Sequence, residues 1–502
     1  MSNKGRTSYQ EIIKSSALIG GASAVNMLLG IVRTKVLAVL IGTEGMGLFG
    51  AFNSVTGLVS SITGMGITSS GVRQIAEAVG TNDEDRVART VFTLRRTAFV
   101  LGLAGMVVLL AFARPISRIT FGSSDHSLEL ALLSVTVLLT SISGGQTALV
   151  QGMRRIRDLA ALNIWGAALG TVTSIAVIYV FRRNGIALFL IAVSVFAIFT
   201  SWWYARKIAV KPVRLPVREV WQESRQLLGM GLAFMASALM GNAVAYFTRV
   251  LVIREMNLAA AGLFQAAWTL SSIYVGFILS AMGADYYPRL TLVAADDREV
   301  NRLVNEQTEV ALLMAIPGIL GTLTFAPLVL HLLYSAQFAP AGGILRWQIL
   351  GVLGRVISWP VGFVLLAKGC ARTFFCTELA GNLAYLGMVW LGLNWFGLKG
   401  LGMAYLGMYL VYGLLVTIIV NGITGFRWDR GNLRLGGGAL AATALVFVAT
   451  SSLVPSPFGV TLAVAVTTGA TVYAVRKIEK RLGISILANV WFRLRSVITK
   501  ST

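Results

Sequence analysis

The chain is a succession of long apolar runs separated by short polar or basic segments. A helix needs about 20 apolar residues to cross the hydrocarbon core of a bilayer. Runs of this length predict fourteen membrane-spanning helices, near residues 15–41, 46–70, 92–112, 128–151, 159–181, 185–205, 227–253, 261–287, 310–333, 345–367, 376–396, 400–421, 437–454 and 457–475. The first run follows three basic residues, as a signal peptide does. It is longer than a signal sequence and ends without a clear cleavage site, so we expect it to be retained.

The composition agrees with this reading. The 502 residues are 56% hydrophobic and only 13% charged, and their mean hydropathy is +0.75. Soluble globular proteins usually carry about 25% charged residues. The low charge excludes a water-soluble enzyme of ordinary surface, and the sequence predicts an all-α integral membrane protein with many spans.

Lysine and arginine collect on one side of the predicted spans, which indicates an orientation. With the N-terminus inside, most of the 43 basic residues fall in inside segments, the C-terminal tail included. The outside loops hold only six, namely Arg114, Arg118, Arg182, Arg183, Arg254 and Lys399. Both termini are therefore predicted to be cytoplasmic. Because the net charge of +22 is divided among small clusters, it does not indicate a nucleic-acid partner.

The two halves of the chain repeat weakly. The motif Gly-Leu-Phe at 47–49 recurs at 262–264, and the glycines that open the sixth and twelfth segments, Gly185 and Gly400, are again 215 residues apart. A repeat of six spans predicts two halves related by an axis along the membrane normal, with a central cavity between them.

This repeat divides the chain into three predicted parts. They are an N-terminal six-helix lobe over residues 1–222, a C-terminal six-helix lobe over 223–434, and an extra helix pair with a cytoplasmic tail over 435–502. In the tail, the apolar positions of residues 484–498 share one helical face, which is typical of a helix lying in the membrane interface.

Ionisable residues inside the predicted spans are few, and each costs about 2.5–3.5 kcal/mol on insertion scales. Arg33 and Lys35 lie in the first span, Arg249 in the seventh, and Arg355 near the middle of the tenth. The alternative for Lys35 and Arg249 is that they extend to the lipid headgroups. We expect the four cations to form a binding site for an anion.

The acidic candidate is Asp285, near the cytoplasmic end of the eighth span. As a carboxylate placed within a span, it is the candidate carrier of a coupling ion, H+ or Na+, and the candidate to close a cytoplasmic gate by pairing with Lys368 or Arg372. The alternative is an ordinary interfacial role beside Tyr286 and Tyr287. The sequence shows no catalytic triad, carboxylate dyad or nucleotide-binding loop. We therefore expect no catalytic residue. Its two cysteines and two histidines lack the spacing of a metal site, so we also expect no metal and no other cofactor.

Four segments resemble the Wzx-type flippases, the polysaccharide transporters of the MOP superfamily. They are RTKVLAVLIGTEGMGLFGAF at 33–52, QGMRRIRDLAALNIWGA at 151–167, AGLFQAAWTLSSIY at 261–274 and LRWQILGVLGRVISWPVGFVLLAKG at 345–369. The likeness extends over about residues 10–425 and is strongest for translocases of O-antigen or enterobacterial-common-antigen type. Such proteins similarly place basic residues at the positions of Lys35, Arg249, Arg355, Lys368 and Arg372.

The resemblance implies a MATE-like two-lobed helical bundle with 12 core spans, to which this chain adds two C-terminal spans. It also implies a flippase of the bacterial inner membrane, which moves undecaprenyl-pyrophosphate-linked oligosaccharide to the periplasmic leaflet by alternating access, for cell-surface polysaccharide assembly. The pyrophosphate would need Arg33, Lys35, Arg249 and Arg355 where water is scarce. Membrane lipids, a polysaccharide polymerase and chain-length machinery are the implied partners.

Other functions stay open on the sequence alone. One is a MATE-like ion-coupled exporter of small molecules, although cationic drugs would call for acidic residues in the cavity and the deep charges here are basic. Another is a membrane polysaccharide polymerase or ligase, which would need a sizeable outside loop. A channel is a third.

The charge distribution makes the topology testable. A phosphatase or reporter fusion after residue 430 should report a cytoplasmic location, and one after residue 456 a periplasmic location, because a predicted span separates them. A periplasmic signal after residue 430 would contradict the fourteen-span topology.

Overall fold

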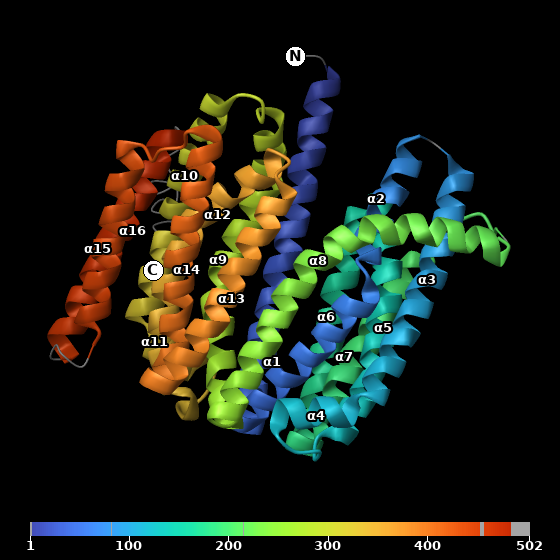
Figure 1. Cartoon of the computed structure of the whole chain (residues 1–502), viewed down its shortest axis with the longest axis horizontal. Helices are drawn as coiled ribbons and strands as arrows, with labels where there is room; N and C mark the ends of the chain where they lie inside the picture. The colour runs from blue at the N-terminus through green and yellow to red at the C-terminus, as the bar shows by residue number, and fades with distance from the viewer. Residues whose placement is uncertain (1–2, 82, 214, 452–455, 483–502) are drawn as a thin grey trace, which may run out of the picture. The chain divides into compact units, whose positions relative to one another are not determined.

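The computed structural model describes residues 3–81, 83–213, 215–451 and 456–482, and every regular element in these ranges is a helix (Figure 1). The chain folds as two compact units. Unit 1 contains the described residues up to Leu263 together with Leu333–Gln337, and unit 2 contains the remaining described residues from Phe264 onward.

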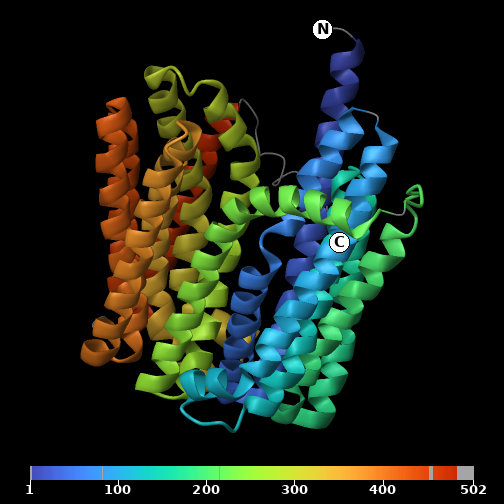
Figure 2. The ribbon, with the colours of Figure 1, turned by 45° about the vertical axis from the view of Figure 1, so that its right-hand side comes forward.

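Unit 1 is built from eight α-helices, a 3-10 turn and the beginning of a ninth helix. These are α1 (Asn3–Gly64), α2 (Ile67–Gly80), α3 (Glu84–Ala111), α4 (Ala113–Phe121), α5 (Ser127–Gly152), α6 (Ile156–Phe181), η1 (Arg182–Gly185), α7 (Ile186–Ala205), α8 (Val217–Glu255) and α9 (Leu258–Leu292). Figures 1 and 2 show the first part of α8 lying across the other helices of unit 1, while its remainder runs alongside them.

Unit 2 contains most of α9 and the later described helices, except that the end of α11 and the first two residues of η2 fall in the Leu333–Gln337 stretch of unit 1. These are α10 (Asp297–Thr324), α11 (Ala326–Leu333), η2 (Ala336–Phe338), α12 (Ala341–Ala367), α13 (Ala371–Phe396), α14 (Leu398–Thr424), α15 (Arg430–Ala449) and α16 (Ser456–Leu482). Asp296 and Asp429 begin α10 and α15, since each carboxylate accepts a hydrogen bond from a backbone N–H of the first helical turn.

The predicted spans correspond to helices of the structure. Eleven helical stretches of the described residues are long and apolar enough to cross a membrane. Two of them, Gly20–Gly64 and Ile156–Ala205, each contain two predicted segments, and the segment predicted at 227–253 lies within α8. The first predicted segment ends at Gly42, where the structure has a kink in α1 with a φ of 65°. The chain is therefore a multi-pass, all-helical membrane protein.

Two predicted segments continue past a helix end. The segment predicted at 46–70 is interrupted after Gly64, because Met65 and Gly66 adopt positive φ angles and α2 starts afresh at Ile67. The segment predicted at 310–333 is divided between α10 and α11. No charged residue marks either break, so the predicted segments run through both.

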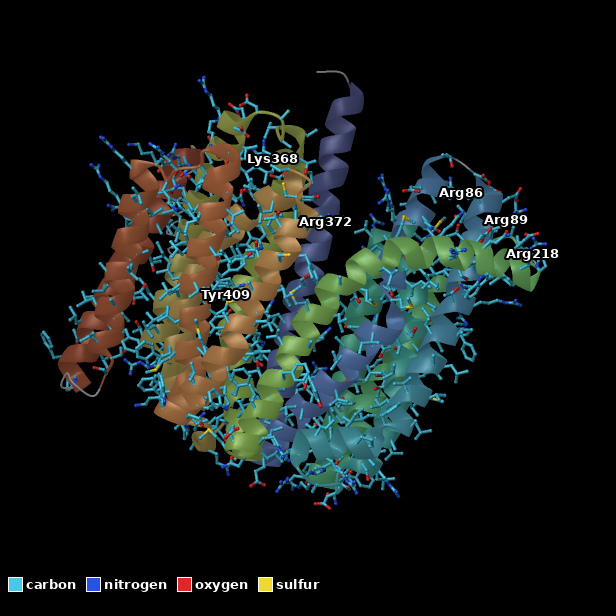
Figure 3. The ribbon with its side chains drawn as sticks, viewed as in Figure 1. Arg86, Arg89, Arg218, Lys368, Arg372 and Tyr409 are labelled. Atoms are coloured by element: carbon cyan, nitrogen blue, oxygen red, sulfur yellow. The ribbon has the colours of Figure 1, made fainter. Side chains whose placement is uncertain are left out.

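The unit boundary differs from the lobe boundary predicted at residue 222. The long helix α8 packs against α1, α2, α3 and α4 and therefore belongs to unit 1. Polar contacts accompany this packing, since Thr93 donates to Glu223 at 2.8 Å and the Thr97 and Ser224 hydroxyls are 2.7 Å apart. Basic side chains gather at one end of unit 1, where Arg86, Arg89 and Arg218 are labelled in Figure 3.

The extra helices α15 and α16 pack against α10 in unit 2 and are bound to it by polar contacts. Glu309 on α10 forms ion pairs of 2.9 Å with both Lys477 and Arg481 on α16. Arg346 on α12 donates to the carbonyl oxygen of Phe447 on α15. The helix pair is thus part of unit 2. The amphipathic helix predicted at 484–498 lies outside the described residues.

The repeated glycine motif forms a reciprocal backbone contact within unit 1. A Cβ atom added to Gly47 would overlap the carbonyl oxygen of Leu258, and one added to Gly262 would overlap the carbonyl oxygen of Thr43. Gly262 follows Gly47 by 215 residues, and Leu258 follows Thr43 by the same number, which is the offset of the predicted repeat. Glycine is required here because α1 and α9 approach each other through their backbones.

This contact generates a stability prediction. Gly262→Ala should lower the melting temperature of the purified protein, because a clash with backbone cannot be relieved by a side-chain rotation and overpacking costs about 1–3 kcal/mol. Gly241→Ala on α8 is the matched control, since a Cβ atom there meets nothing within 4 Å. Equal thermal stability of the two variants would contradict the prediction.

Candidate functional site

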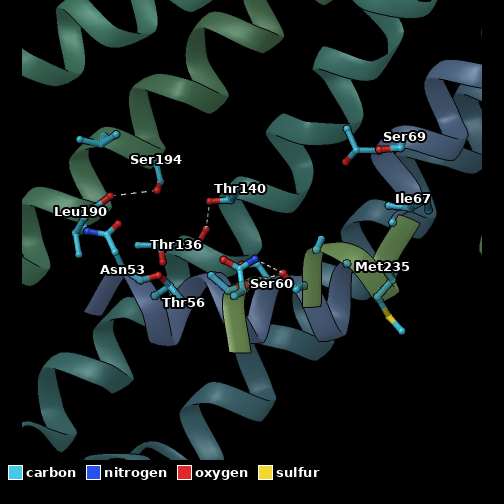
Figure 4. Close-up of a pocket in the computed structure, with 18 residues that line it drawn as sticks. Asn53, Thr56, Ser60, Ile67, Ser69, Thr136, Thr140, Leu190, Ser194 and Met235 are labelled. Atoms are coloured by element: carbon cyan, nitrogen blue, oxygen red, sulfur yellow. Dashed lines mark hydrogen bonds between the residues drawn. The ribbon is translucent and has the colours of Figure 1, made fainter. Parts of the chain in front are cut away.

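Unit 1 contains a polar cavity of about 500 Å³ (Figure 4). Its walls come from helices far apart in the sequence, namely α1, α2, α5, α7 and α8. The polar residues that line it are Asn53, Thr56, Ser60, Ser61, Thr68, Ser69, Thr136, Thr140, Ser194 and Asn242. None of the described residues around this cavity is ionisable. It is called the unit 1 cavity below.

The hydrogen bonds of this cavity leave polar atoms facing inward. Asn242 on α8 donates to the Ser61 hydroxyl on α1 at 2.6 Å, which joins two walls. Thr140 and Ser194 donate to backbone carbonyls one turn earlier in their own helices, as Figure 4 shows. A hydroxyl that donates in this way still has acceptor capacity, and amides supply both donors and acceptors. The cavity is therefore suited to a neutral, polyhydroxylated ligand.

The three basic residues predicted for unit 1 do not line this cavity. Lys35 donates to the backbone carbonyl of Tyr334. Arg249 is only 9% exposed and donates to the carbonyl of Ala245 at 2.9 Å, so its guanidinium contacts its own helix. Arg33 is partly buried on α1. Their predicted role in binding an anion stays a prediction.

Unit 2 contains a second, smaller pocket of about 250 Å³, called the unit 2 pocket below. Arg355 contributes to it from the middle of α12, about 20 Å along the helix axis from either helix end. Glu378 contributes from α13, and Tyr409 and Tyr412 from α14. The Tyr412 hydroxyl donates to Oε1 of Glu378 at 2.5 Å. The pocket thus combines one cation, one carboxylate and several aromatic rings.

An aromatic stripe on α14 forms one wall of the unit 2 pocket. Tyr405, Tyr409 and Tyr412 recur at helical spacing, with ring centroids 5.0 and 6.4 Å apart along the series. Arg355 lies beside Tyr405 and Tyr409, and Trp359 lines the pocket one turn further along α12. Figure 3 shows Tyr409 midway along unit 2. The rings meet edge to face, with interplanar angles of 72° and 84°, and they give the pocket an aromatic wall next to the guanidinium.

Glu378 is the functional candidate that the sequence reading overlooked in favour of Asp285. Asp285 is 75% exposed and pairs with Arg289 one turn away at 3.3 Å. Glu378 is the third residue of the segment predicted at 376–396, and no role was predicted for it from the sequence. The recurrence of tyrosine at 405, 409 and 412 on the following helix is the signal that would have pointed to a polar pocket there.

The predicted gate residues lie near one end of unit 2. Lys368 forms an ion pair with Asp297 at 2.5 Å, and Arg372 begins α13 (Figure 3). In this structure Asp285 contacts Arg289 instead of either cation, so its pairing with Lys368 or Arg372 stays a prediction for another state. Within the described residues, no group of three or more histidine, cysteine or acidic side chains could hold a metal ion.

Solved structures of other proteins share the fold of this chain. An inward-facing multidrug resistance MATE family transporter of the MOP superfamily matches with a TM-score of 0.68 and 15% identity, over 79% of this chain and 95% of that chain. The lipid II flippase MurJ, in an inward closed conformation, matches with a TM-score of 0.64 and 14% identity, over 93% and 100%. The fold is MATE-like, as the sequence predicted.

The chain belongs to a family described as polysaccharide biosynthesis proteins, whose sequence model matches residues 36–342. The lipid III flippase of Escherichia coli (strain K12) is 24% identical over 380 residues, which cover 74% of this chain and 88% of the relative. The succinoglycan biosynthesis transport protein ExoT of Rhizobium meliloti (strain 1021) is 25% identical over 330 residues, which cover 64% of this chain and 61% of the relative. The resemblance found in the sequence is confirmed at the level of the family.

Proposed function

We propose that this protein is a flippase that moves a lipid-linked oligosaccharide across a bacterial inner membrane by alternating access. The cargo class is an undecaprenyl-pyrophosphate-linked oligosaccharide, taken from the cytoplasmic to the periplasmic leaflet for cell-surface polysaccharide assembly. Family membership and the flippase and transport functions named for its relatives support this proposal. These relatives are transporters, so we propose that this protein is a membrane transporter and not an enzyme.

The unit 1 cavity is the observation that carries the proposal. A sugar head group presents many hydroxyls and little net charge, and it needs hydroxyl and amide partners to replace water. The unit 1 cavity offers ten such side chains and no ionisable residue among those that line it. Its volume of about 500 Å³ lies within the range of small-molecule sites, about 300–1,000 Å³.

The chemistry of this cavity argues against the rival functions. An exporter of cationic drugs would need acidic side chains to offset the charge of its cargo, and the unit 1 cavity supplies none among its described residues. A polymerase or ligase would need an extended outside loop that carries reactive groups. The longest connection between described helices is the one between α7 and α8, which we predict to be cytoplasmic.

The pyrophosphate requires cations in addition to the sugar cavity. Arg355 is the best placed of the four predicted residues, because it lines the unit 2 pocket at the middle of a span. We infer that Arg33, Lys35 and Arg249 assist it in at least one state of the transport cycle. An arginine can bind a phosphate oxygen pair through two N–H donors, which suits a pyrophosphate.

The remaining features of the proposal concern orientation, energy and partners. We propose cytoplasmic termini, and a driving force from an H+ or Na+ gradient, the membrane potential or consumption of the flipped product. Asp285 is retained as a candidate ion carrier and Lys368 and Arg372 as its gate partners. A polysaccharide polymerase and chain-length machinery would act on the flipped cargo.

Flipping can be measured directly in proteoliposomes. The full chain should make a lipid-linked oligosaccharide accessible to a reagent in the opposite leaflet. Arg33→Ala and Arg355→Ala should each lower the initial rate by about 10- to 100-fold, because a hydrogen bond to a charged group contributes about 1.5–3 kcal/mol. Arg114→Ala, in a predicted outside loop, is the control. Normal rates in both Arg33→Ala and Arg355→Ala would refute the anion site, and no flipping by the wild type would refute the function.

The sugar cavity is tested by filling it. Ser60→Trp places a large ring in the unit 1 cavity and should abolish flipping while the protein remains folded. Ile62→Trp is the matched control two residues along the same helix, where the side chain is 51% exposed and lines neither pocket. If both variants transport at the same rate, the cavity does not hold the cargo.

A further inference from the structure

The unit 2 pocket places a carboxylate where an anion is expected to bind. Arg355 from α12 and Glu378 from α13 line the same pocket, and its remaining described lining includes no other charged side chain. An acid here opposes the attraction that a phosphate would feel toward Arg355. Glu378 therefore needs an explanation other than direct attraction of the anion.

The energetics of the empty pocket explain why an acid is useful. A lone guanidinium at membrane depth is costly, and leaving a buried charge without its counter-charge is more costly than removing both. Ionised Glu378 brings the formal charge of the pocket to zero. The Tyr412 hydroxyl stabilises this carboxylate by donating to Oε1 at 2.5 Å. Protonated Glu378 leaves the pocket with the single positive charge of Arg355.

We propose that Glu378 is a proton-binding site that controls the affinity of the unit 2 pocket for a phosphate-type anion. This inference deepens the proposed function, on which it rests for the identity of the anion. The proton binds a carboxylate oxygen of Glu378, and the anion then binds Arg355. Binding of the proton and binding of the anion favour each other. The proton makes the pocket more positive, which favours the anion, and the anion makes it more negative, which favours the proton.

The sign of the pH dependence follows from this linkage. As the pH rises through the titration of Glu378, the pocket loses its net positive charge and anion affinity falls. The groups that face Glu378 come from the two helices packed against α13, namely Arg355 on α12 and Tyr409 and Tyr412 on α14. Arginine and tyrosine ordinarily keep their protons throughout the neutral range. Glu378 is thus the group in the pocket whose charge changes.

The experiment uses the full chain purified in detergent and a short-chain prenyl pyrophosphoryl-N-acetylglucosamine as the probe. Both phosphates of this diester stay ionised between about pH 5 and pH 8, so the probe does not titrate. Wild-type affinity should fall by about 5- to 150-fold over this range, the usual size of coupling between two sites. Glu378→Gln should bind with the affinity that the wild type has at low pH, without pH dependence.

A matched control separates this pocket from other acids. Glu306→Gln removes a carboxylate on α10 that is 53% exposed and lies outside the pocket, and it should keep the wild-type pH profile. Calorimetry in buffers of different ionisation enthalpy should show that the wild type takes up protons on binding the probe. This measurement uses the wild type alone, so it does not require any variant to fold. Wild-type affinity that is independent of pH, or unchanged pH dependence in Glu378→Gln, would overturn the inference.

The flipping assay distinguishes this inference from the proposed function. If the wild type flips a lipid-linked oligosaccharide but binds the probe without proton uptake, the role of Glu378 is refuted and the function stands. If the wild type binds the probe with proton uptake but flips no lipid-linked oligosaccharide in proteoliposomes, the function is refuted and the linkage stands.

Discussion

The cost of placing charge in a hydrocarbon core governs the chemistry of this protein. Where a polar surface is needed in unit 1, the chain uses hydroxyls and amides, which satisfy part of their hydrogen-bonding capacity within their own helices. Where a cation lies deep in unit 2, a carboxylate and tyrosines share its pocket. Lys35 and Arg249 follow the same rule by donating to backbone carbonyls. Each of these polar groups thus lies against other polar atoms of the protein.

The fold could be predicted from the sequence because the membrane imposes a length on every span. Fourteen apolar runs all overlap helices, and the repeated Gly-Leu-Phe motif marks a true backbone contact at Gly47 and Gly262. The breaks after Gly64 and Thr324 could not be predicted, because backbone geometry makes them without changing hydropathy. The unit boundary at Leu263 depends on the packing of α8 against other helices, which is a tertiary property.

The candidate sites could be predicted only in part. Arg355 was identified from its depth in a span, which is a property of the linear sequence. The unit 1 cavity was missed because its polar residues are dispersed over five helices, and each serine or threonine alone is unremarkable in a membrane helix. Glu378 could not be identified from the sequence because its candidate role depends on sharing a pocket with Arg355 and Tyr412, which belong to neighbouring helices. Chemistry that arises from contacts between helices is not visible in any single segment.

The ion pairs of Glu309 have a consequence for what removal of the C-terminal helix pair would cost. Its carboxylate is only 16% exposed, and both of its cationic partners, Lys477 and Arg481, stand on α16. A chain that ended before α15 would keep this acid without a counter-charge, at a penalty that adds to the lost apolar packing. A neutral residue at position 309 would remove the electrostatic part of that penalty and leave only the packing part. The acid and the helix pair therefore act as one unit of stability.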